Sequence, residues 1–195
     1  MTLYPAGQPV PPTSTLNFAP NAYAVANGAI MRIGTGGQVC VNVGTVGSAP
    51  GGSQVILDAT GYLTIAGITQ VPMLPSPVRL VDTRTAAGGG PIPTGSTRCF
   101  TVTGGTSGVP TTAIAIVLNV AAVNYTTRGW VTLFPAGGQL PQTSTLNFDP
   151  SLYAMANGAV LAIGAGGQVC VNVGTINSVP GSSDVVLDAV GYLVP

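Results

Sequence analysis

Lysine, glutamate and histidine are absent from this chain of 195 residues, and its charged side chains are five arginines and five aspartates. Charged residues make up 5% of the sequence, against about 25% in an ordinary soluble domain. Without histidine, Ser-His-Asp and Cys-His nucleophile systems and histidine-ligated metal sites are excluded. A net charge of zero gives no attraction to nucleic acid or to an anionic membrane. We therefore expect no enzyme, no cofactor or metal, and no nucleic-acid partner.

Long hydrophobic runs and helical periodicity are scarce as well. The longest nearly unbroken apolar stretch, 113–123, is too short to span a bilayer as a helix, so no membrane insertion is expected. Only 22–29 and 152–159 could form a helical turn or two. Short Val, Ile and Leu runs between Gly and Pro predict strands instead. They lie at 2–5, 13–18, 29–33, 38–43 and 54–63, at 77–83, 97–103 and 113–124, and at 131–135, 143–148, 159–163, 168–173 and 184–193. The chain is expected to be all-β.

An internal repeat organises the sequence. Residues 1–65 align without a gap with residues 131–195, and 42 of the 65 positions are identical. The intervening residues 66–130 follow the same order of a Cys-containing strand, a Val-Pro turn and a long apolar strand. We name these parts the N-terminal copy (1–65), the middle segment (66–130) and the C-terminal copy (131–195).

The repeat predicts tandem β-sandwich-like lobes of about 65 residues each, in the order B-A-B. Residues 66–195 together would make one complete repeat unit, whereas the N-terminal copy has no A-type lobe of its own. We expect the two copies to share one backbone. Met1 aligns with Val131, within an expected strand, so we also expect the chain to be part of a longer array.

Two aspartates occupy equivalent apolar contexts. Asp58 and Asp188 each follow a three-residue apolar run and precede Ala. A carboxylate among apolar residues must be paired or hydrogen-bonded, so we expect both to be buried and bound by Arg79, Arg84 or backbone N–H groups. Asp184 has no acidic counterpart in the N-terminal copy. Along a strand it would lie roughly 13 Å from Asp188, too far for a glycosidase pair.

Glycine-rich loops precede the strands at 38–43 and 168–173. A dinucleotide-binding loop must open a helix, whereas Gln38-Val39-Cys40-Val41 has a strand pattern. We therefore interpret these loops as tight turns.

Several motifs in fixed order resemble a known repeat. They are Pro77-Val78-Arg79-Leu80-Val81-Asp82-Thr83-Arg84, Val117-Leu118-Asn119-Val120, Gly129-Trp130-Val131-Thr132-Leu133-Phe134-Pro135, Ser144-Thr145-Leu146-Asn147-Phe148 and Val185-Val186-Leu187-Asp188-Ala189-Val190-Gly191-Tyr192. The pattern is similar to a module of secreted and cell-surface proteins of actinobacteria and filamentous, Chloroflexus-like bacteria. The resemblance covers the whole chain and implies an extracellular or cell-surface all-β module without catalysis of its own.

The three cysteines allow more than one interpretation. Cys40 and Cys170 are equivalent positions of the two copies, whereas Cys99 belongs to the middle segment. Relatives carry Pro-Cys-Gly where this chain has Pro-Ala-Gly, which makes Cys99 the substitute partner. In an extracellular context we predict a Cys99–Cys170 disulfide, which leaves Cys40 to pair with an A-type lobe upstream of Met1. Three buried free thiols are the alternative.

Two functions fit these observations. The first is a non-catalytic structural protein that associates with copies of itself into a filament, sheath or surface layer, because so few charges oppose association. The second is a carbohydrate- or cell-wall-binding module appended to a secreted enzyme, in which Trp130 would contact the glycan. We predict the first function, the self-associating structural protein.

Overall fold

The computed structural model describes residues 1–12, 14–20, 22, 24–45, 50–59, 61–62 and 72–195. The predicted boundary between residues 65 and 66 lies outside the described residues, as do Thr13 and Leu63 of two expected strands. The described chain is all-β apart from short 3-10 turns, as the sequence predicts.

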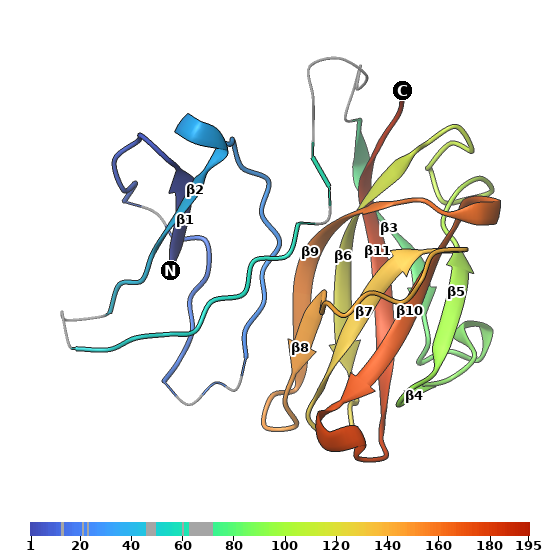
Figure 1. The fold of residues 1–195 in the computed structure, drawn as a ribbon. Coiled ribbons are helices and arrows are strands. Elements are labelled where there is room, and N and C mark those ends of the chain that lie inside the picture. Colours follow the sequence, from blue (N-terminus) through green and yellow to red (C-terminus); the bar gives the residue numbers. More distant parts are fainter. Residues whose placement is uncertain (13, 21, 23, 46–49, 60, 63–71) are drawn as a thin grey trace.

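Two antiparallel sheets form a sandwich from residue 73 onward (Figure 1). The first sheet has the order β5-β10-β7-β8 and the second the order β3-β11-β6-β9, with β4 paired to β11. The strands are β3 (Met73–Asp82), β4 (Ile92–Pro93), β5 (Thr97–Thr101), β6 (Ala115–Val123), β7 (Gly129–Pro135), β8 (Leu146–Phe148), β9 (Ala154–Ala162), β10 (Gln168–Thr175) and β11 (Ser182–Leu193). The core between the sheets is rich in Val and Leu, with Ile116, Leu118, Leu146 and Leu187 almost fully buried.

The middle segment and the C-terminal copy do not form separate lobes. Strand β11 of the C-terminal copy lies between β3 and β6 of the middle segment, and β10 pairs on one side with β5. The sequence predicts a separate lobe for each 65 residues, and the structure does not have this arrangement. Each half contributes strands that are apolar on both faces, and such strands need neighbours that the other half supplies. Residues 73–195 therefore form one interleaved sandwich.

The N-terminal copy reproduces only part of the C-terminal copy. Strands β1 (Thr2–Pro5) and β2 (Val39–Asn42) pair with Thr2 opposite Asn42, the register in which Thr132 of β7 faces Asn172 of β10. The glycine loops that precede β2 and β10 are both 3-10 turns, with Gly36 at φ 67° and Gly166 at φ 68°. This supports the interpretation of both loops as tight turns.

The remainder of the N-terminal copy does not adopt the expected strands. Residues 14–20, 24–33 and 50–59 are described and contain no strand, whereas their equivalents include β8, β9 and β11. The prediction that both copies share one backbone is therefore wrong beyond β1 and β2. The physical reason is the missing partner, since β9 pairs only with β6, and β11 pairs only with strands of the middle segment. For β8, two of the three residues opposite it, Gly129 and Trp130, also belong to the middle segment.

The segment 152–159 is also not helical. It enters β9, in which Gly158 is paired with Asn119 of β6. Pairing along a complete neighbouring strand overrides the weak helical tendency of this Ala-containing stretch.

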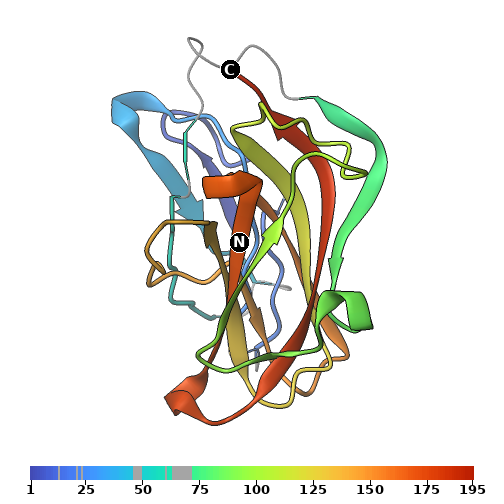
Figure 2. The ribbon, with the colours of Figure 1, turned by 90° about the vertical axis from the view of Figure 1, so that its right-hand side faces the viewer.

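The N-terminal copy stands beside the β9 edge of the sandwich, away from β3 and β5 (Figures 1 and 2). The backbone N–H of Gly28 donates to the Asn157 side chain at 2.8 Å, and a Cβ at Gly28 would collide with the Gly158 carbonyl. The two copies therefore meet through equivalent Asn-Gly positions.

Candidate functional site

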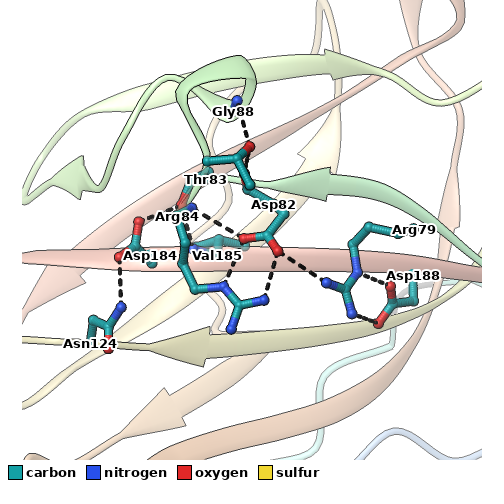
Figure 3. Close-up of polar contacts among 10 residues, drawn as sticks. Arg79, Asp82, Thr83, Arg84, Gly88, Asn124, Asp184, Val185 and Asp188 are labelled. Atoms are coloured by element: carbon teal, nitrogen blue, oxygen red, sulfur yellow. Dashed lines mark hydrogen bonds and ion pairs between the residues drawn. The ribbon is translucent and has the colours of Figure 1, made fainter.

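A ladder of charged side chains crosses β3 and β11 (Figure 3). Arg79 faces Asp188 across the two strands and binds it through Nε, and its Nη2 lies 3.4 Å from the second carboxylate oxygen. The Asp188 side chain is 18% exposed and that of Arg79 is 49% exposed. The expected pairing of Asp188 with an arginine is present, but at the sandwich surface rather than in its interior.

Asp82 binds two arginines, Arg84 of the Asp82-Thr83-Arg84 motif and Arg79 of β3. Arg84 binds it in a fork, with Nε and Nη2 at 2.8 and 2.6 Å from its two oxygens, and Arg79 Nη1 lies at 3.1 Å. Hydrogen bonding from Arg84 lowers the pKa of Asp82 from 3.8 to about 2. Arg84 thus binds Asp82 rather than Asp58 or Asp188, because the turn that follows β3 brings its guanidinium group back onto the carboxylate at the end of the strand.

Asp184 forms the buried polar site of the sandwich. Its carboxylate oxygens accept from the Thr83 hydroxyl at 2.8 Å and from the Asn124 amide at 3.0 Å, and Thr83 in turn accepts from the Val185 N–H. Asp184 is 6% exposed and Thr83 is fully buried. Sequence reasoning missed this site, although Asp184 replaces Gln54 of the other copy in front of an apolar run.

Asp58 is exposed, and no ion pair joins it to a described residue, so the prediction of a buried, bound carboxylate is wrong there. Its equivalent, Asp188, is bound by Arg79 from β3, and among the described residues no such strand lies beside Asp58. The apolar run that precedes Asp58 shows the same contrast. Ile56 is 85% and Leu57 53% exposed, whereas Val186 and Leu187 are 5% and 0% exposed.

A disulfide joins the two halves of the sandwich. Cys99 on β5 faces Cys170 on β10, and the two side chains form the predicted bond. Cys40 occupies the same place on β2 and is a free, half-buried thiol. The pairing strand β5 comes from the middle segment, so the N-terminal copy has no β5 of its own to supply a cysteine.

Trp130 packs within the sheet. It lies opposite Gly174 in the β7–β10 pair, and its indole fills the space that a Cβ at Gly174 would need. It is half-buried. Two surface hollows of about 320 and 360 Å³ are both lined in part by Arg79 and Leu80, and Trp130 lines neither of them. Neither of these two hollows therefore includes the predicted glycan contact, Trp130.

No family model and no curated protein matches this sequence. Among the described residues, no three His, Cys, Asp or Glu side chains gather as metal ligands would. None of the helices in the described ranges has the length and apolarity of a membrane span. The distinctive arrangements among the described residues are thus a charged ladder, a buried carboxylate network, one disulfide, and an N-terminal copy in which only the β1–β2 pair of the C-terminal copy's strands is formed.

Proposed function

We propose that the protein is a non-catalytic structural repeat of an extracellular filament, sheath or surface layer, joined to its neighbours through the N-terminal copy. The observation that carries this proposal is the exposure of Ile56 and Leu57 in a sequence whose counterpart is buried in the sandwich core. Apolar residues in this pattern favour a partner that removes them from water.

The distribution of charge supports association at this end of the molecule. The N-terminal copy carries two charged residues, Arg32 and Asp58, and the other eight lie in 66–195. Charged side chains on exposed strands are a principal protection against unwanted pairing. The β3 edge has this protection through Arg79, whereas the N-terminal copy has little of it.

The disulfide supports an extracellular location, because disulfides persist in oxidising compartments and are rare in the cytosol. The same bond stiffens the only complete sandwich among the described residues, which suits a load-bearing module.

Sedimentation velocity and negative-stain microscopy of the chain over rising concentration test the proposal. We expect concentration-dependent particles with a regular axial repeat, and Leu57→Asp should shift them toward monomer. A matched control is Val10→Asp, because Val10 and its equivalent Leu140 are exposed to nearly the same degree, 48% and 49%. A monomer at every concentration, or retention of the monomer on cell-wall glycan, would contradict the structural function and favour a binding module.

A further inference from the structure

We propose that the exposed apolar residues 55–57 of one molecule dock into a hollow between β3 and β5 of a second copy, where Asp58 of the first molecule pairs with Arg98 of the second. This inference rests on the proposed function, and it names the surface of the neighbouring molecule that removes Ile56 and Leu57 from water. The hollow has a volume of about 360 Å³, and its apolar lining comes from Leu80, Val81, Ala87 and Phe100. We call it the β3–β5 hollow.

The β3–β5 hollow is suited to a few apolar side chains. Strands β3 and β5 are edge strands of the two sheets, and Leu80 and Phe100 are half-buried against the core at this side of the sandwich. The second hollow beside Arg79 is lined mainly by Thr, Ser and Gly. Ligand sites occupy about 300–1,000 Å³, so the β3–β5 hollow has room for a few side chains rather than for a whole strand.

Arg98 places a positive charge without a counter-ion beside this hollow. It precedes Phe100 by two residues on β5, so the two side chains lie on the same face of the strand. Its Nη1 donates to the carbonyls of Gly88 and Gly90 at 2.9 and 2.8 Å, and Gly88 itself lines the hollow. Among the described residues, Nε and Nη2 have no acceptor, and these two groups form the fork that suits a carboxylate.

Asp58 is the complementary group. It is exposed, and no ion pair joins it to a described residue. It directly follows Ile56 and Leu57, so a carboxylate stands next to apolar side chains on this surface, as a guanidinium stands next to an apolar hollow on the other. Arg79 and Arg84 already bind carboxylates of their own sandwich, which leaves Arg98 to receive Asp58.

The two surfaces lie on different sides of the molecule. The N-terminal copy stands beside the β9 edge, and the sandwich separates it from β5 (Figures 1 and 2). One molecule therefore does not satisfy its own two surfaces. A contact between unlike surfaces of successive molecules leaves one surface of each kind open at the ends, so it extends head to tail instead of closing into a pair.

Disulfide trapping tests this contact. A protein with Leu57→Cys is mixed with a second protein with Ala87→Cys, both with Cys40→Ser, in glutathione disulfide. One engineered thiolate attacks glutathione disulfide and releases glutathione, and the other then displaces the remaining glutathione, so that the two protein sulfurs are bonded.

Non-reducing peptide mapping should find position 57 linked to position 87 about tenfold more often than when Val10→Cys replaces Leu57→Cys, because docking raises the effective concentration of the two thiols. Val10 is a suitable control because it is 48% exposed in the same copy. Links between two positions 57, as in a closed dimer of N-terminal copies, or no excess over the control would overturn the proposal.

Charge reversal tests the pairing of Asp58 with Arg98. Asp58→Arg and Arg98→Asp should each weaken self-association about tenfold or more in sedimentation velocity, because each brings like charges together. An equimolar mixture of the two variants should assemble again, since every junction then joins opposite charges. A mixture that assembles no better than either variant refutes the ion pair.

Two controls keep the outcomes separate. Arg98→Asp also removes the bonds to Gly88 and Gly90, so its folding is checked by urea unfolding, and the trapping experiment decides if this variant does not fold. If the unaltered chain assembles but gives neither the trapped link nor the rescued mixture, this inference fails alone. If the unaltered chain is a monomer at every concentration, the proposed function fails with it.

Discussion

Leu187 and Leu57 form a natural matched pair, because the same Val-x-Leu-Asp-Ala sequence surrounds both and their surroundings in the fold differ. Leu187 is fully buried between the sheets, so truncation to Ala removes its buried methyl groups and leaves a cavity. Such changes cost about 2–5 kcal/mol. Leu57 is 53% exposed, and substitutions at such sites usually stay within about 0.5 kcal/mol.

Urea unfolding followed by tryptophan fluorescence measures this difference. Trp130 is the only tryptophan and lies on β7, so its emission reports on the sandwich. Leu187→Ala should lower the free energy of unfolding by about 2–5 kcal/mol, which corresponds to a fall in Tm of about 5–15 °C for a protein of this size. Leu57→Ala should leave the urea concentration at the midpoint of unfolding unchanged. Equal losses in both variants would refute the conclusion that the N-terminal copy is incomplete.

Three further outcomes are expected. Asp184→Ala should destabilise the sandwich by about 2–3 kcal/mol in urea unfolding, because it leaves the buried Thr83 hydroxyl without its acceptor and removes the bond to Asn124, whereas Asp188→Ala should cost under about 1 kcal/mol; the reverse order would contradict the assignment of the buried site. The folded-state pKa of Asp82 is lowered, so its contribution to stability is complete above about pH 4 and is lost as the pH falls toward 2; Asp82→Asn should flatten the acid limb of a Tm-against-pH curve, and an unchanged limb would exclude that role. Replacing both cysteines of the disulfide by Ser should cost about 4 kcal/mol in the chain-entropy model, and Cys40→Ser should have no effect on unfolding.

The sequence determined those parts of the molecule whose partners lie close by in the chain. The all-β class follows from short β-branched runs between Gly and Pro, and the glycine turns at Gly36 and Gly166 take the same positive φ in both copies. The β1–β2 register repeats that of β7–β10 because both strands belong to the same copy. Strand pairing that involves residues of one copy alone can therefore be predicted from the sequence of that copy.

Only the tertiary structure decided which equivalent residues are buried. The sequence assigns the same environment to Asp58 and Asp188, yet Arg79 on β3 reaches only the latter. The sequence also favoured Asp188 over Asp184 as the buried carboxylate. The fold reverses this order because Thr83 and Asn124, which are distant in the chain, converge on Asp184.

The physical reason is that a strand has no stable conformation without neighbours for its backbone groups and side chains. Residues 184–193 form the centre of a sheet because the middle segment supplies a strand on each side, whereas the described residues of 54–63 have none. The two copies are identical at 42 of 65 positions, so both have a sequence that can form this strand. Whether the strand forms depends on the neighbouring strands that pair with it.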